Sequence, residues 1–342
     1  MADRIRKINI DKNTVHAVVT TDGSVLPTTA SIYGLACSAE GTLYAADIIN
    51  HVVYKVFEDG RVKGSIVGKI GVPGDVVADG NAAVDGLPAT VAAPVSASVP
   101  VSRLREPCGI CVDASGNIYV STAASRIYQG SVNKIYRISP SGRCQTLAGA
   151  ITAGDVVNDN GLLCRFSSPT GLAVDKAGIV YVADRDNNKI KKVYPNGKTV
   201  VLAGAGDASS GMANGNGNNA KFDTPWDVCV DQNGMVYVAD TNNYRIRQID
   251  PAGNVVTLAG FADGSVDGVG NTARFGFVYN ICIDASGVIW ALDFGNKTIR
   301  RITNDGKVTT FLGWKDGTTN DASAIAVDKS GFLYILEKNV AL

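Results

Sequence analysis

Short runs of alternating apolar and polar residues follow one another along the chain, and each run ends at Gly, Asn, Asp or Pro. The clearest stretch, residues 225–260, reads PWDVCVDQNGMVYVADTNNYRIRQIDPAGNVVTLAG. Its four β-branched and apolar runs, separated by turn residues, predict four short antiparallel strands. Further copies begin at or near Tyr33, Pro107, Pro169, Tyr279 and Ser323. Six copies predict an all-β fold, a six-bladed β-propeller with one four-stranded blade per repeat and strands a to d running outward from the axis.

The sixth copy, residues 322–342, holds only strands a and b. Residues 4–20, RIRKINIDKNTVHAVVT, match the c and d strands of the repeat, as in RIRQIDPAGNVVTLAG at 245–260. We therefore expect the N-terminal pair to complete the C-terminal blade, which is split between 1–20 and 322–342. Closure removes the open sheet edges that would template aggregation. The prediction is a single domain over residues 1–342.

Two connections are much longer than a blade requires. Residues 69–106 form an insertion rich in Ala, Val, Pro and Ser, and residues 122–132 lengthen the b-to-c turn of blade 2. The strand directions put the d-to-a and b-to-c connections on one face, here called the top face. Loops of this length are usually functional or linker-like. If the whole insertion 69–106 has an ordered conformation, a binding partner is expected to hold it in place.

Charge and cysteine content limit the expected partners and cellular location of the protein. Lys plus Arg and Asp plus Glu both number 32, so no overall field favours nucleic acid or an anionic membrane. The first residues are charged and alternating, and they offer no signal peptide or membrane span. Seven cysteines, an odd number, are spread along the chain, which argues against a disulfide framework. These features predict a reducing location, in the cytoplasm or in a virion assembled there.

The repeated V-A-D-x-x-N-x-R-I element and the linker signatures resemble NHL repeats. The linker signatures are Leu258–Gly260, Asp267–Gly270, Ala273–Phe275 and Pro169–Gly171. The resemblance covers almost the whole chain and implies the propeller fold. It says little about function, because the family includes a zinc lyase, RNA-binding repressors, sensor domains and interaction scaffolds. The lyases hold zinc through several histidines, whereas this chain has only His16 and His51, so no metal or cofactor is expected.

Several repeated polar residues have a structural explanation. Asp residues at 47, 184, 240 and 293 precede Asn residues at 50, 187, 243 and 296. We expect each Asp to accept backbone N–H bonds across the b-to-c turn, and each Asn to take the left-handed conformation. The loop carboxylates are interpreted as polar turns, with a bound divalent cation left open; they are Asp75, Asp79, Asp155, Asp159, Asp263 and Asp267. Phe166, Phe222 and Phe275 are assigned to the core.

Cysteines and basic residues also recur by position in the repeat. Cys111, Cys229 and Cys282 occupy a strand-a position held elsewhere by Ala, and Cys164 stands where Ala220 and Ala273 stand, which indicates packing. Strand c carries Arg6, Lys7, Lys191, Lys192, Arg247, Arg300 and Arg301. These side chains are expected to cover apolar strand surface while their charges stay solvated. A nucleic-acid-binding girdle is the alternative, and it is not favoured.

The start of strand a departs most from the repeat. The residue before the repeat's Gly is Tyr33, Cys108, Thr170, Trp226, Tyr279 or Ser323. Blades 4 and 5 replace the Gly itself by Asp227 and Asn280. Aromatic rings beside hydrogen-bonding groups are typical of a binding surface, so we predict a site of Trp226, Asp227, Tyr279 and Asn280, with Tyr33. The alternative is that the rings only close the channel mouth.

These observations favour a non-enzymatic propeller that binds another protein through its top face. Such a scaffold could be a structural subunit of a large assembly such as a virion. Two alternatives stay open: a lactonase-like or lyase-like enzyme with its site at the channel mouth, and an RNA-binding propeller. The enzyme hypothesis requires polar groups converging on the channel. The RNA hypothesis requires a contiguous positive surface.

Overall fold

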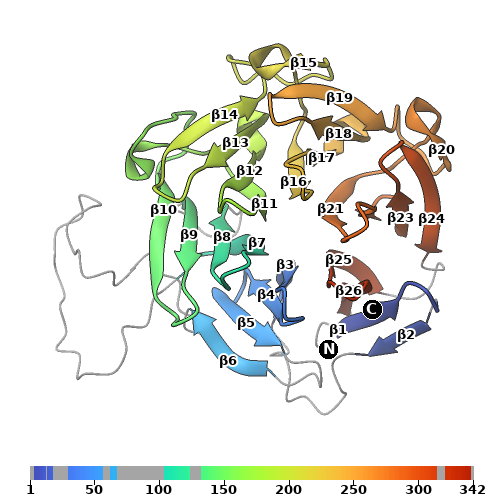
Figure 1. Cartoon of the computed structure of the whole chain (residues 1–342), viewed down its shortest axis with the longest axis horizontal. Coiled ribbons are helices and arrows are strands. Elements are labelled where there is room, and N and C mark those ends of the chain that lie inside the picture. The colour runs from blue at the N-terminus through green and yellow to red at the C-terminus, as the bar shows by residue number, and fades with distance from the viewer. Residues whose placement is uncertain are drawn as a thin grey trace.

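The structure is a computed structural model, and it describes residues 4–12, 14–17, 30–56, 62–67, 104–123, 132–313 and 320–339. Most of the predicted 69–106 insertion lies outside the described residues, as do residues 124–131 of the second insertion. Six antiparallel sheets surround a central axis, as the sequence predicts (Figure 1). The fold is a six-bladed β-propeller.

The blades follow one another around the ring in chain order. Blade 1 holds β3 (Ile32–Cys37), β4 (Leu43–Asp47), β5 (Val52–Val56) and β6 (Val62–Val67). Blade 2 holds β7 (Pro107–Val112), β8 (Ile118–Thr122), β9 (Asn133–Ile138) and β10 (Cys144–Ala150). Blade 3 holds β11 (Pro169–Val174), β12 (Val180–Asp184), β13 (Lys189–Val193) and β14 (Thr199–Ala203).

The other three blades include the split one. Blade 4 holds β16 (Pro225–Val230), β17 (Val236–Asp240), β18 (Arg245–Ile249) and β19 (Asn254–Ala259). Blade 5 holds β21 (Val278–Ile283), β22 (Ile289–Asp293), β23 (Thr298–Ile302) and β24 (Lys307–Gly313). Blade 6 holds β25 (Asn320–Val327), β26 (Phe332–Asn339), β1 (Arg4–Asn9) and β2 (Thr14–Ala17).

Blade 6 closes the ring as predicted. Its strand order is β2-β1-β26-β25, so the N-terminal strands form the outer half of the C-terminal blade. Arg4 pairs with Glu337 at one end of the β1–β26 ladder, and Asn9 pairs with Phe332 at the other. Arg6 Nε donates to Glu337 Oε2 over 3.1 Å across the same seam. The ring is therefore closed by a continuous antiparallel ladder.

The a-to-b turns on the bottom face are built by one aspartate each in blades 2 to 6. In blade 3, Asp175 Oδ1 accepts the backbone N–H groups of Ala177 and Ile179, each over 2.9 Å. The Tyr181 hydroxyl donates to the second oxygen over 3.1 Å. Gly178 sits at φ 76°, which glycine adopts without strain. The repeat's Asp, Gly and Tyr thus form one turn.

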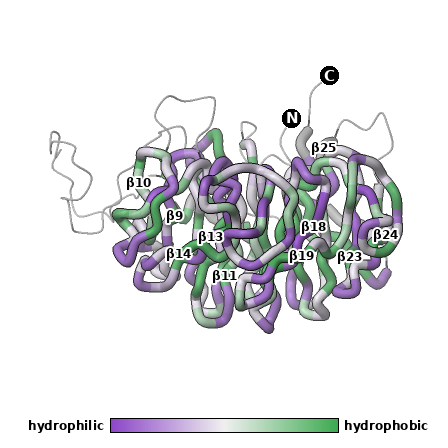
Figure 2. The backbone as a smooth tube through the Cα atoms, turned by 90° about the horizontal axis from the view of Figure 1, so that it is seen from above, coloured by the Kyte–Doolittle hydropathy of each residue, from purple (hydrophilic) through white to green (hydrophobic). Residues whose placement is uncertain are grey.

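The core lies between neighbouring blades. Cys229, Tyr237 and Ala239 of blade 4 pack with Ile281 and Ile289 of blade 5, and equivalent clusters join the other blades. Phe166, Phe222 and Phe275 are fully buried, as expected. Seen from the side, the ring is a disc in which apolar and polar stretches alternate along the chain (Figure 2). Each blade therefore depends on both of its neighbours for burial.

Two blades have a fifth strand, which the sequence analysis did not predict. The linkers into blades 4 and 5 contribute β15 (Gly215–Asn216) and β20 (Gly268–Val269), which pair with the outer strands β19 and β24. They satisfy part of an otherwise open sheet edge. The described helices are single 3₁₀ turns: η1 (Gly161–Leu163), η2 (Arg185–Asn187), η3 (Gly217–Asn219), η4 (Thr241–Asn243) and η5 (Gly270–Thr272). None of these described turns could cross a membrane.

Candidate functional site

The six a strands meet around the channel, where the repeat's Gly allows a close approach between neighbours. A Cβ added at Gly109 would lie 2.0 Å from the Thr170 carbonyl oxygen. At Gly171 it would lie 1.9 Å from Asp227 Oδ1. Only glycine fits such separations. Blades 4 and 5 carry Asp227 and Asn280 at this position, so the channel mouth is polar on one side.

Asp227 is a buried carboxylate held by the backbone. Its side chain accepts the Val228 N–H at Oδ1 and the Ile281 N–H at Oδ2, each over 2.9 Å. The residue is 8% exposed, and burial raises the pKa of its carboxyl to about 7, although these hydrogen bonds act in the opposite direction. Burial outweighs them because no ion pair among the described residues includes Asp227.

Asn280 lies beside Asp227 on the next blade. Its Nδ2 is 3.4 Å from Asp227 Oδ2, which confirms that the two substituted Gly positions meet. Its Oδ1 is buried and has no hydrogen-bond partner among the described residues. A buried acceptor left unsatisfied costs about 1–3 kcal/mol. The pair therefore leaves hydrogen-bonding capacity unused at the channel mouth.

Aromatic rings gather above this pair. The ring centroids of Trp226 and Tyr279 are 4.7 Å apart, and those of Tyr279 and Phe294 are 5.3 Å apart. Phe277 stacks with Tyr279 at 6.4 Å and lies 5.3 Å from Tyr244. Phe277 is 39% exposed and Phe294 is 37% exposed. We call these five residues the aromatic patch, and its contacts are typical of favourable aromatic pairs.

A pocket of about 320 Å³ opens beside the aromatic patch. It is lined by Tyr33, Trp226, Tyr279, Asn280, Leu292, Phe294, Ala322 and Ser323. Tyr33 belongs to blade 1, so the pocket reaches across the mouth of the channel. Asp227 lines the adjoining channel cavity of about 190 Å³, and Asn280 lines both spaces. The five residues chosen from the sequence are thus brought together, four around the pocket and one just below it.

The sequence did not point to the other three members of the aromatic patch, which are Tyr244, Phe277 and Phe294. Phe294 follows the strand-b Asp, where other blades have Ile48, Arg185 or Thr241. Phe277 precedes strand a by one residue. A comparison of these repeat positions would have identified both, because each lies on the top face next to a position already singled out. Arg185 occupies the equivalent place in blade 3, and its guanidinium lies 4.8 Å from the centre of the Trp226 ring.

Comparison with known proteins identifies the repeat. A family model described as the Teneurin NHL domain matches residues 164–250. NHL repeat-containing protein 2 of Bos taurus is 41% identical over 100 residues, which cover 28% of this chain and 14% of that protein. The chain is an NHL-repeat β-propeller. The match spans only about a seventh of the length of NHL repeat-containing protein 2.

Solved structures resemble this NHL-repeat propeller at low identity. A gluconolactonase from Xanthomonas campestris has a TM-score of 0.58 at 15% identity, with 98% of this chain and 95% of that one covered. Virginiamycin B lyase from Staphylococcus aureus has a TM-score of 0.51 at 12% identity, with 98% and 100% covered. At these identities the likeness concerns the fold alone.

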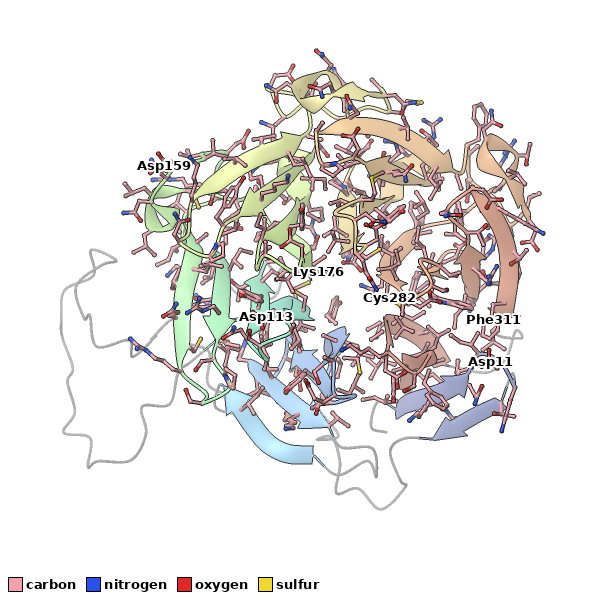
Figure 3. The ribbon with its side chains drawn as sticks, in the orientation of Figure 1. Asp11, Asp113, Asp159, Lys176, Cys282 and Phe311 are labelled. Carbon is pink, nitrogen blue, oxygen red and sulfur yellow. The ribbon has the colours of Figure 1, made fainter. Side chains whose placement is uncertain are left out.

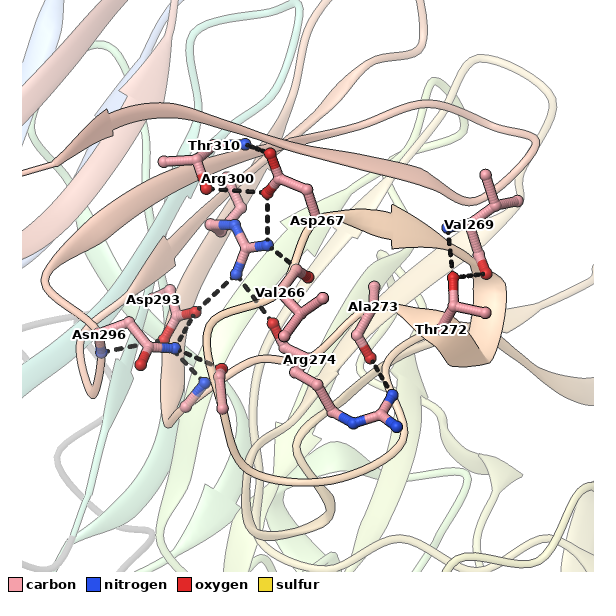
Figure 4. A network of polar contacts seen from close by, with 12 residues as sticks. Val266, Asp267, Val269, Thr272, Ala273, Arg274, Asp293, Asn296, Arg300 and Thr310 are labelled. Carbon is pink, nitrogen blue, oxygen red and sulfur yellow. Dashed lines mark hydrogen bonds and ion pairs between the residues drawn. The ribbon is translucent and has the colours of Figure 1, made fainter.

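In this NHL propeller the prediction that the strand-c cations stay solvated is wrong for the residues on one face of strand c. Lys191, Arg247 and Arg300 are fully buried. Arg300 bridges the strand-b carboxylate of Asp293, at 3.2 Å, to the linker carboxylate of Asp267, at 2.9 Å (Figure 4). It also donates to the Arg274 and Val266 carbonyl oxygens. Alternate residues of strand c face inward, and each inward cation fastens the linker onto its blade.

The same arrangement explains the linker aspartates. In blade 3, Lys191 Nζ lies 2.7 Å from Asp184 Oδ2 and 2.8 Å from Asp155 Oδ1, and Lys189 also contacts Asp155. In blade 4, the partner of Arg247 is Asp240, and burial raises the pKa of that carboxyl to about 6 although Arg247 opposes the shift. Lysine and arginine side chains of the protein therefore form ion pairs with Asp155 and Asp267, the carboxylates for which a bound divalent cation was the alternative.

The b-to-c turn differs from expectation in one detail. Asp47 Oδ1 accepts the backbone N–H groups of Ser31, Ile49 and Asn50, as predicted for the strand-end Asp. The left-handed residue is the one after the Asn, as at His51 with φ 59°. The Asn instead donates its side-chain amide to the Asp, over 2.7 Å in blade 1. The residue that follows the Asn therefore makes the chain reversal, at His51, Asn188, Tyr244 and Lys297.

The channel cysteines pack as predicted. Cys111, Cys229 and Cys282 line the channel, and Cys282 lies near the axis of the ring (Figure 3). Burial raises the pKa of all three thiols well above its usual value, which disfavours the reactive thiolate. No disulfide joins Cys108 to Cys111. The described residues contain no group of three or more His, Cys, Asp or Glu suited to a metal.

Proposed function

We propose that this NHL propeller is a binding module whose top face engages another protein through the aromatic patch. The observation that carries the proposal is the group of partly exposed rings beside a pocket at the channel mouth. Aromatic side chains are enriched at binding hot spots because they bury large, rigid area at low entropic cost. The patch lies at the starts of the a strands and on the adjoining connections of blades 4 and 5, which the closed ring holds in place.

The proposal extends to a scaffold role. A propeller that presents one rigid face can join a neighbouring subunit of a large assembly, such as a virion, while the rest of the disc stays independent. The equal numbers of acidic and basic residues give no support to an RNA-binding function.

The enzyme alternative draws on one observation. Asp227 has a pKa near neutrality and lies at the channel, as a general acid or base would. Both of its oxygens are engaged by backbone N–H groups, and the carboxyl is almost wholly buried. A lactonase-like or lyase-like activity is therefore the second candidate.

A photo-crosslinking residue placed at Phe277 tests the docking proposal in cells of the native source. Phe277 is 39% exposed within the patch, and Val256, 46% exposed on β19, is the matched control position away from it. We expect a discrete protein adduct from position 277 and none from position 256. The adduct should disappear when Trp226→Ala is added, because that change removes a central ring of the patch.

Thermal melting of the Trp226→Ala variant provides the folding control. Equal adducts at 277 and 256, or an adduct that survives Trp226→Ala, would contradict the docking proposal. Turnover of a lactone that is lost in Asp227→Ala would replace it with the enzyme alternative.

A further inference from the structure

Asp227 lies on strand a of blade 4 and is buried, as are the carboxylates that end strand b in blades 3 to 5, but its charge environment differs from theirs. Asp184, Asp240 and Asp293 each form an ion pair with the inward cation of strand c. No ion pair among the described residues includes Asp227. A buried charge without a counterion is unfavourable, and proteins usually pair it or bind a cation there.

A buried acceptor for which the described residues supply no hydrogen-bond donor lies beside this carboxylate. Asn280 Oδ1 is buried without a partner in the described part of the chain, and the same side chain is 3.4 Å from Asp227 Oδ2 through its Nδ2. Asn280 lines both the pocket and the channel cavity that contains Asp227. Among the residues that the structure describes, Asn280 Oδ1 therefore lacks a hydrogen-bond donor, and the Asp227 carboxylate on the adjoining channel cavity lacks a counterion.

The walls above these acceptors are suited to a positive charge. Trp226, Tyr279 and Phe294 line the pocket, and the face of an aromatic ring attracts cations. The patch already contacts one cation from this chain, because the Arg185 guanidinium lies 4.8 Å from the Trp226 ring centre. Leu292 adds an aliphatic wall. An elongated group with an apolar stem and a cationic end matches a pocket whose walls are aromatic and aliphatic and whose base carries acceptors.

We propose that the pocket receives a lysine side chain of the partner protein, with its stem along the rings that line the pocket and its ammonium group at Asn280 and Asp227. The proposal rests on the docking function above and names the chemistry that the docking site recognises. Lysine fits better than arginine because an ammonium is a compact charge on a flexible stem, whereas a guanidinium requires two parallel acceptors. Both oxygens of Asp227 already accept backbone N–H bonds, so no bidentate edge is left.

The ionisation of Asp227 should control this recognition. Burial raises the pKa of its carboxyl to about 7, so the carboxylate forms mainly above neutral pH. The thiols that face it are Cys111 from β7, Cys229 from β16 and Cys282 from β21, and burial raises the pKa of each. They stay neutral over this range. The negative charge of Asp231, which follows β16, also raises the pKa of the Cys229 thiol.

Two matched probes test the proposal on the whole chain: N-acetyl-lysine methylamide and its neutral counterpart, N-acetyl-norleucine methylamide. The readout is the NMR shift of the Trp226 indole N–H, assigned by its loss in Trp226→Phe. We expect the lysine probe to bind more tightly than the norleucine probe. This preference should grow about tenfold from pH 6 to pH 8, as a carboxyl with a pKa of about 7 ionises.

Asp227→Gly is the matched variant, because blades 1 to 3 carry Gly34, Gly109 and Gly171 at the same repeat position. It should abolish both the preference for lysine and its pH dependence. Asp227→Asn, which keeps the side-chain size, serves if the glycine variant does not fold. Equal binding of the two probes by the native chain, or an undiminished lysine preference in both variants, would overturn the proposal.

The outcomes separate this inference from the docking function. A patch-dependent crosslinked partner without any lysine preference would retain docking and reject the lysine pocket. Lysine binding without a crosslinked protein would retain the cation-binding chemistry and reject a protein as its source.

Discussion

At the scale of single residues, two substitutions distinguish one side of the ring from the other. The repeat requires Gly where neighbouring a strands approach, yet blades 4 and 5 have Asp227 and Asn280 there. The sequence located both residues because they interrupt a repeated pattern. It did not show that Asp227 would be buried without a counterion, since that depends on what the adjacent blades place around it.

Asp227 should make stability depend on pH. Its pKa is raised from 3.8 to about 7 in the folded chain, so the folded state binds this proton more tightly than the unfolded state. The resulting stabilisation is complete below about pH 4 and is lost as pH rises to about 7. We expect the native chain to lose on the order of 2–3 kcal/mol relative to Asp227→Gly between pH 5 and pH 8. Urea unfolding of both proteins at the two pH values measures this, and parallel profiles would contradict it.

At the scale of elements, each blade is joined to its incoming linker by charge as well as by apolar packing. The two-residue alternation of side chains correctly predicted strand c. The same alternation places neighbouring residues on opposite faces of the sheet. Arg300 and Arg301 are adjacent in sequence, yet Arg300 is fully buried between two carboxylates and Arg301 is partly exposed. The linker decides this difference, because it supplies Asp267 and two carbonyl acceptors.

Arg300→Met should destabilise the fold far more than Arg301→Met. The first change leaves the fully buried Asp293 carboxylate without its cation, a loss of about 3–5 kcal/mol. The second alters a partly exposed residue and should cost less than about 1 kcal/mol. Chemical unfolding at neutral pH compares the two. Similar free energies for both variants would show that the buried bridge is not a stabilising element.

At the scale of the whole molecule, the two ends of the chain share one blade. Ile5 and Ile8 of β1 are fully buried, so the N-terminal strand belongs to the core as well as to the seam. Each blade packs against both neighbours, and an opened blade 6 would expose β26 as an edge. The aromatic patch depends on this closure indirectly, because Tyr33 of blade 1 and Ser323 of blade 6 line its pocket.

Deletion of residues 1–17 should therefore lower the melting temperature by at least about 10 °C and promote aggregation, because the edge of β26 is uncovered. The control is a circular permutant in which residue 339 continues through a short linker into residues 4–17. Arg4 and Glu337 are direct partners, so the linker replaces a normal b-to-c turn. The permutant should melt near the native value. A permutant as unstable as the deletion would show that the strand pairing does not explain the loss.

The sequence by itself determined the number of blades, the split blade and the main residues of the candidate site. These features follow from a repeated local pattern: turns at Gly, Asn and Asp, alternation within strands, and interruptions of the repeat at Trp226, Asp227, Tyr279 and Asn280.

Only the tertiary structure decided which charges are buried and which rings join the patch. Lys191, Arg247 and Arg300 are buried because the incoming linker of each blade folds back over strand c, where its carbonyl groups accept their hydrogen bonds. Phe277 and Phe294 join Trp226 because blades 4 and 5 lie side by side, and β15 and β20 form where a linker meets an open edge. A repeat pattern defines each blade, whereas contacts between segments far apart in sequence depend on how the closed ring brings them together.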